Sequence, residues 1–172
     1  MRRAAAALAL ALAGGAVRAA PAPQPAPLPP AAGLQAIGDA GQAVSLTTAD
    51  LAALPRETVS AAPTHDSAPR RYEGARLTDV LRAVGAPLGP RLHGPAVRDV
   101  VVATGADGYR AVFSLAETDP ANHAGARILI ADRVDGAPLD AKEGPLRLVV
   151  DGDLRPARSV HNLVRVEVRR LP

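Results

Sequence analysis

The chain has 172 residues, a formal net charge of +3, no cysteine, and only 2% aromatic residues. This length suits one domain with a buried core. The absence of cysteine excludes disulfide bonds and a thiolate nucleophile.

The first 19 residues have the pattern of a secretory signal peptide. Two arginines precede an apolar run over residues 4–13 that is too short to span a bilayer, and Val17 and Ala19 suit a cleavage site after Ala19. We therefore expect a periplasmic or secreted protein without stable membrane insertion, the alternative being an uncleaved N-terminal anchor. Cleavage leaves 17 basic and 17 acidic residues, and this zero net charge gives no support to nucleic acid as a partner.

Residues 20–32 are interpreted as a linker. The sequence PAPQPAPLPP at 21–30 contains six prolines and no charge, which favours an extended, polyproline-like tether. The folded domain is then expected over residues 33–172.

Two helices are predicted in the first half of this domain. Thr47 or Thr48 can cap a short helix that runs through Ala53. A second helix follows at LTDVLRAVG, where Gly85 ends it. Its apolar face at helical spacing consists of Leu77, Val80, Leu81 and Val84.

Strands are predicted where Val, Ile and Leu dominate short segments bounded by Gly and Asp turns. After Phe113, the sequence SLAE predicts a capping box in which Ser114 accepts from the backbone N–H of Glu117. These elements predict a compact α+β domain with a mixed, strand-rich sheet and a few short helices. The predicted strands are 57–61, 100–104, 109–113, 127–131, 146–150 and 163–168.

Four segments, taken in order and spacing, resemble a known family. They are YEGARLTDVLRAVGAP, VVATGADGYRAVFSLAETDP, ILIADRVDGAPLDAKEGPLRLVVDGD and RPARSVHNLVRVEV. The chain is similar to small exported proteins built on the molybdopterin-binding domain of the sulfite oxidase family. The resemblance covers about residues 33–172 and implies the sulfite-oxidase-like molybdopterin-binding fold.

The sequence departs from the family pattern in two places. Catalytic members bind molybdenum through a cysteine thiolate between the first strand and the Y-E-G segment, where this chain reads SAAPTHDSAPRRYEG. Without any cysteine, the chain lacks the soft ligand that such a metal centre requires. Many small members also resemble R-P-A-R-W-V-R, where this chain has Ser159 and His161 in place of the aromatic residue and the last arginine.

Tyr109 is the first candidate binding residue, because a ring beside the Gly-rich turn that contains Asp107 is a plausible stacking platform for a flat heterocycle. Phe113, on the same strand face, is expected to point into the core. The opposite rim of a cleft at Tyr109 is expected to carry Arg158. The alternatives are that Tyr109 is a core residue with its hydroxyl at the edge and that Asp107 only shapes its turn.

The resemblance also implies that the R-P-A-R segment contacts the cofactor. Arg155 and Arg158 suit capture of a phosphate or a pterin carbonyl, and Arg71 and His161 complete the predicted cofactor-binding set. The alternative is that these arginines are merely solvated. The four histidines show no H-x-H or H-x-x-x-H spacing, so no metal site is predicted from them.

The predicted function is an exported, non-catalytic pterin-binding sensor or adaptor. Its ligand would be a pterin or a molybdopterin-like molecule without molybdenum. Its protein partner would be the extracytoplasmic domain of a membrane receptor. The alternatives are a molybdopterin-dependent oxidoreductase or its accessory subunit, against which the missing thiolate argues, and a purely structural protein.

Overall fold

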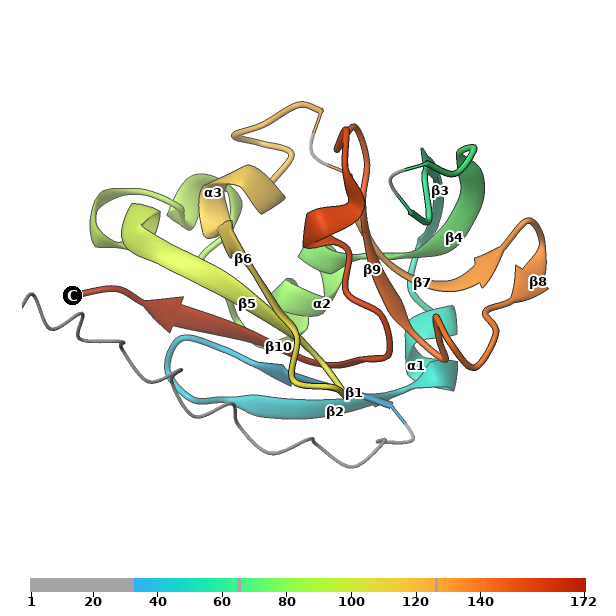
Figure 1. The fold of residues 1–172 in the computed structure, drawn as a ribbon. Coiled ribbons are helices and arrows are strands. Elements are labelled where there is room, and N and C mark those ends of the chain that lie inside the picture. The colour runs from blue at the N-terminus through green and yellow to red at the C-terminus, as the bar shows by residue number, and fades with distance from the viewer. Residues whose placement is uncertain (1–32, 65, 126) are drawn as a thin grey trace, which may run out of the picture.

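A computed structural model of the protein describes residues 33–64, 66–125 and 127–172. The predicted signal peptide and the predicted linker lie outside these residues. The described chain forms two five-stranded sheets, here called sheet A and sheet B. Figure 1 shows sheet A on one side of the molecule, sheet B on the other, and helix α2 between them.

Sheet A has the strand order β2-β1-β10-β5-β6. Strands β1 and β10 are parallel, and the other neighbours are antiparallel. The first and last segments of the domain therefore lie side by side near the centre of one sheet. Its strands are β1 (Gly33–Ile37), β2 (Ala43–Thr47), β5 (Asp99–Gly105), β6 (Arg110–Ser114) and β10 (Leu163–Arg170).

Sheet B has the strand order β3-β4-β7-β8, and β9 also pairs with β7. All of its pairs are antiparallel. Its strands are β3 (Arg56–Ala61), β4 (Arg70–Arg76), β7 (Ile128–Val134), β8 (Ala137–Pro138) and β9 (Arg147–Val150).

The helices are short and sit at the connections between strands. Thr47 caps α1 with a capping box in which Asp50 is the reciprocal partner. Helix α2 begins directly after strand β4, and helix α3 begins directly after strand β6. The set is α1 (Thr48–Ala52), α2 (Leu77–Ala83), α3 (Leu115–Thr118) and the 3-10 turns η1 (Gly89–Arg91), η2 (Gly94–Arg98) and η3 (Pro156–Arg158).

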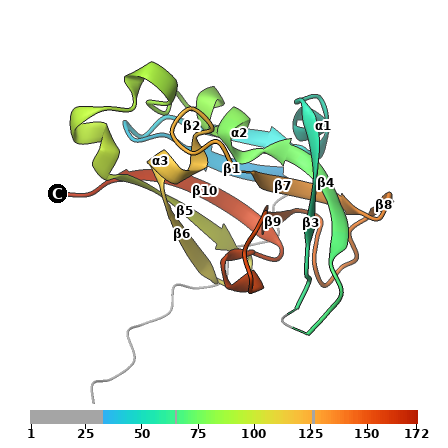
Figure 2. The same ribbon diagram turned by 90° about the horizontal axis from the view of Figure 1, so that it is seen from above.

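The main core lies between sheet A and α2. Leu77, Val80 and Leu81 of α2 are fully buried there with Phe113 of β6. A second, smaller cluster in sheet B is centred on Tyr72. Figure 2 shows the two sheets from above, with the loop between β3 and β4 extending away from sheet A.

The α+β prediction is confirmed, and each predicted strand and helix has a counterpart in the structure. The structure differs at α3, where Ser114 Oγ accepts from the N–H of Ala116 at 3.3 Å. The carboxylate of Glu117 instead contacts Arg158 at 3.1 Å. A long-range ion pair therefore replaces the local capping contact. Within the described ranges, no helix has both the length and the apolarity needed to cross a membrane.

Candidate functional site

The turn between β5 and β6 is a closed, hydrogen-bonded unit. The N–H of Gly105 donates to the carbonyl of Tyr109 at 2.9 Å, and Gly108 has a φ of +84°, which favours glycine. Asp107 Oδ1 accepts from the N–H of Tyr109 at 2.9 Å. Asp107 thus shapes the turn, and the turn fixes where the side chain of Tyr109 leaves the backbone.

Tyr109 and Phe113 lie on one face of the β6 segment but in different environments. Phe113 is 1% exposed and packs in the main core, as predicted, whereas Tyr109 is 48% exposed. The hydroxyl of Tyr109 donates to the carbonyl of Ala157 in η3 at 2.5 Å. This bond joins the β5–β6 turn to the R-P-A-R segment and orients a half-exposed ring.

A hollow of about 320 Å³ opens beside this ring. Its described lining is Asp107, Gly108, Tyr109 and Arg110, which include two charged residues and one aromatic residue. The volume lies at the lower end of the range of small-molecule sites, roughly 300–1,000 Å³. The hollow is therefore large enough to be considered as a small-molecule site.

Arg158 is fully engaged by carboxylates. Its Nε and Nη2 donate to the two oxygens of Asp153 at 3.0 and 2.7 Å, and its Nη1 donates to Glu117 at 3.1 Å. The guanidinium stacks on the Phe113 ring, 5.2 Å from its centroid. The hydrogen bonds to Asp153 are the main reason that the pKa of Arg158 is raised.

Arg158 lines a second, separate cavity of about 70 Å³. This volume is far below that of a typical ligand site. Arg158 was predicted on the opposite rim of the cleft at Tyr109, but it is not among the described residues that line the larger hollow. Its ion pairs with Glu117 and Asp153 instead hold η3 in place. The described lining of the small cavity is Glu117, His123, Gly125, Arg127, Ile128, Val150, Asp151 and Arg158.

The other predicted residues are dispersed. Arg155 is exposed at the start of η3, whereas Arg71 lies on β4 of sheet B, 4.0 Å from Glu73 and largely exposed. His161 is half-buried. Burial, followed by the positive charge of Arg147, lowers the pKa of His161. The structure therefore brings together Asp107, Tyr109 and Ala157 of the R-P-A-R segment, and it leaves Arg71 outside this group.

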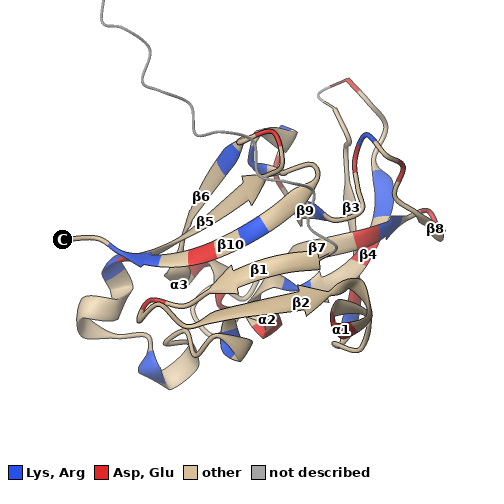
Figure 3. Ribbon diagram, turned by 90° about the horizontal axis from the view of Figure 1, so that it is seen from below, with Lys and Arg blue, Asp and Glu red and all other residues tan. Residues whose placement is uncertain are grey.

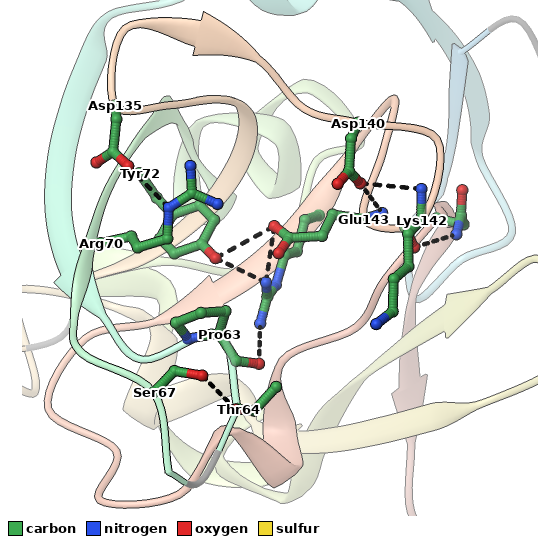
Figure 4. Close-up of polar contacts among 11 residues, drawn as sticks. Pro63, Thr64, Ser67, Arg70, Tyr72, Asp135, Asp140, Lys142 and Glu143 are labelled. Carbon is green, nitrogen blue, oxygen red and sulfur yellow. Dashed lines mark hydrogen bonds and ion pairs between the residues drawn. The ribbon is translucent and has the colours of Figure 1, made fainter.

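Sheet B contains a buried polar network that was not predicted from the sequence. Arg147 on β9 is 1% exposed, and its Nη1 donates to the Tyr72 hydroxyl at 2.8 Å and contacts Glu143 at 2.9 Å. The Tyr72 hydroxyl donates to Glu143 at 3.2 Å. Arg147 Nη2 donates to the carbonyl of Pro63 at 3.2 Å. Figure 4 shows Tyr72 and Glu143 facing one another beside Pro63.

The bond from Arg147 to Pro63 joins this network to the segment between β3 and β4, where the family resemblance implies a cysteine. Pro63 lies in that segment, and the hydroxyls of Thr64 and Ser67 bond to each other within it. Burial raises the pKa of Tyr72 to about 12. The sequence offered one indication of this network, which is Arg147 inside the apolar segment GPLRLVV. A charged residue in a buried strand requires a partner.

Comparison with known proteins identifies the family. The family model for the oxidoreductase molybdopterin binding domain matches residues 30–172. The chain belongs to this family.

A solved structure supports the fold assignment. The chain is similar to the sulfane dehydrogenase SoxCD from Paracoccus pantotrophus, with 19% identity and a TM-score of 0.58. The match covers 79% of this chain and 37% of the SoxCD chain. This chain therefore spans well under half of the length of the SoxCD chain. The predicted sulfite-oxidase-like fold is confirmed. No curated protein matches the chain.

The donor set does not fit a thiolate-bound molybdenum centre. The chain has no cysteine, and the described hydroxyls in the corresponding segment, those of Thr64 and Ser67, are hard oxygen donors. Among the described residues, no group of three or more His, Asp or Glu could hold a metal ion.

Proposed function

We propose that the protein is a non-catalytic binding member of its family that holds a pterin in the hollow beside Tyr109. The observation that carries this proposal is the ring of Tyr109, which is half-exposed over the hollow and oriented by its bond to Ala157. Aromatic rings of this kind stack on flat heterocycles. Asp107 and Arg110 add an acceptor and a donor at the edge of the ring, where a pterin has complementary groups.

The proposed role is that of a sensor or adaptor outside the cytoplasm. The signal-peptide pattern at residues 1–19 supports export, and the missing thiolate argues against redox turnover. The partner in this proposal is the extracytoplasmic domain of a membrane receptor. The intact mass of exported protein tests the first step, because cleavage after Ala19 predicts a chain that starts at Ala20.

Calorimetric titration with a reduced pterin tests the proposed binding. Tyr109→Ala should weaken binding by about 1–3 kcal/mol, the usual contribution of stacking on an aromatic side chain. Tyr109→Phe keeps the ring and loses only the orienting bond to Ala157, so its affinity should lie between those of the parent and Tyr109→Ala. Absence of binding to the parent protein, or equal affinity of Tyr109→Ala and the parent, would contradict the proposal.

Family membership favours a second candidate function, a molybdopterin-dependent oxidoreductase or its accessory subunit. Elemental analysis after expression in a host that makes the cofactor separates the two candidates. Stoichiometric molybdenum with redox turnover would establish the second candidate and remove the first.

A further inference from the structure

The face of sheet A that points away from the core is free of described helices. In Figure 3 the strands of sheet A lie in front, and α2 and α3 lie behind them. Val166 and Val168 of β10 point into the main core, so the alternate residues of β10 form the opposite face. We call this opposite surface the outer face of sheet A.

Strand register places the outer-face residues in two adjacent rows. Arg165 pairs with Thr104, which pairs with Arg110. In the neighbouring row, Glu167 pairs with Val102, which pairs with Val112. Arg169 follows Glu167 on the same face of β10. Figure 3 shows the acidic residue between basic residues along β10.

The charges of this face are unbalanced. Three guanidiniums surround one carboxylate, and Arg169 bonds to Glu167 at 2.8 Å. Hydrogen bonding to Arg169, supported by the charges of Arg165 and Arg110, lowers the pKa of Glu167. Neither Arg110 nor Arg165 has a hydrogen-bonding or ion-pairing partner among the described residues, and Nε of Arg165 is enclosed without one.

We propose that the outer face of sheet A docks an acidic protein surface, which presents carboxylates to Arg110 and Arg165 and an apolar side chain to Val112. Val112 is 56% exposed at the edge strand, whereas its neighbour Val102 is buried. Arginine beside apolar side chains is typical of protein interfaces. Complementary charge steers such a partner and fixes its orientation.

The same features disfavour two other occupants. A second copy of this chain would bring two surfaces with surplus positive charge together, which costs free energy. An anionic membrane would meet Glu167 at the centre of the face, and Val112 offers little apolar area for insertion. A protein surface can place a donor opposite Glu167 and acceptors opposite the arginines.

Binding of poly-L-glutamate to the full chain tests this proposal, which does not depend on the pterin. We expect binding at 50 mM salt that weakens about tenfold or more at 200 mM, because screening shortens the range of charge interactions. Arg110→Gln/Arg165→Gln/Arg169→Gln should lose at least about tenfold in affinity. Glu167→Gln should bind more tightly, a gain that misfolding cannot produce.

A second triple variant controls for net charge. Arg70→Gln/Arg82→Gln/Arg133→Gln removes the same charge from elements outside sheet A and should bind poly-L-glutamate like the parent. Equal loss in both triple variants, or no binding to the parent, would overturn the proposal. Binding only to phosphatidylglycerol vesicles, or a dimer by sedimentation that the first triple variant abolishes, would also overturn it.

Discussion

At the scale of single residues, one strand face carries two aromatic side chains with different roles. Phe113 is buried beneath the Arg158 guanidinium, and Tyr109 is half-exposed at the start of the strand. The separation follows from position, because Phe113 lies over the core and Tyr109 lies at the turn. Stability and binding should therefore be separable by mutation.

Phe113→Ala should lower the free energy of unfolding by about 3–5 kcal/mol, as expected for a buried aromatic residue. Val112→Ala, on the opposite face of the same strand, should change it by no more than about 0.5 kcal/mol. Urea unfolding of both variants measures the difference. Similar losses in the two variants would contradict the assignment of faces.

His161 should make stability depend on pH. Its pKa in the folded protein is lowered from 6.5, mainly by burial and then by Arg147, so the unfolded chain binds the proton more readily. Stability should therefore fall as the pH drops below about 6.5 and level off below the folded pKa. His161→Asn should reduce the dependence of the thermal melting temperature on pH between pH 5 and 7. An unchanged slope in this variant would refute the role of His161.

At the scale of elements, η3 is held from both sides. Arg158 ties it to Glu117 on α3 and to Asp153 in the preceding loop, and Ala157 receives the Tyr109 hydroxyl. The family resemblance suggested Arg158 as a ligand contact. In the structure Arg158 instead holds the segment that orients Tyr109, the proposed stacking residue.

Arg158→Ala should release η3 and make Tyr109 more accessible to iodide. The chain has no tryptophan, and Tyr72 is fully buried, so quenchable tyrosine fluorescence reports on Tyr109. Pterin affinity should fall with little loss of stability, because exposed ion pairs contribute at most about 1 kcal/mol each. Arg127→Ala, which removes a pair with Asp151 beside the small cavity, is the control. Quenching equal to that of the parent would contradict the positioning role.

The segment after β3 depends on the buried network below it. Arg147→Ala should cost about 3–5 kcal/mol, because it leaves the largely buried Glu143 carboxylate without its cation. Arg147→Met/Glu143→Leu should recover most of this loss, since both charges are then removed. Tyr72→Phe should cost about 1–3 kcal/mol through the lost hydroxyl. Chemical unfolding measures these differences, and the single variants Arg147→Met and Glu143→Leu complete a double-mutant cycle in which additivity would show that the two residues are not coupled.

At the scale of the whole molecule, Arg110 belongs both to the hollow beside Tyr109 and to the outer face of sheet A. If a bound pterin contacts the Arg110 side chain in the hollow, that side chain is no longer available to an acidic partner on the outer face of sheet A. Saturating pterin should then weaken poly-L-glutamate binding by about fivefold or more, and the reverse effect should be equal. Identical titrations with and without pterin would show that the two sites are independent.

Local patterns were sufficient for much of the fold. The apolar face of 77–84 predicted α2, and apolar segments predicted β5, β6, β7, β9 and β10, whereas β1 and β2 of sheet A were not predicted. Strand β4, with RRYEGAR, was not recognised as a strand, because its charged residues hide the alternation. The partners of Arg158 were also not predicted, since Glu117 is 41 residues away in sequence.

The sequence by itself determined the family, the missing thiolate, and Phe113 as a core residue. These depend on residue identity and on short periodic patterns, which any segment carries on its own. The tertiary structure alone decided that Arg158 is neutralised by two carboxylates, that Arg147 is buried with Tyr72, and that Arg110 and Arg165 share one face. These facts depend on which strands become neighbours, and strand pairing is fixed by the packing of the whole domain.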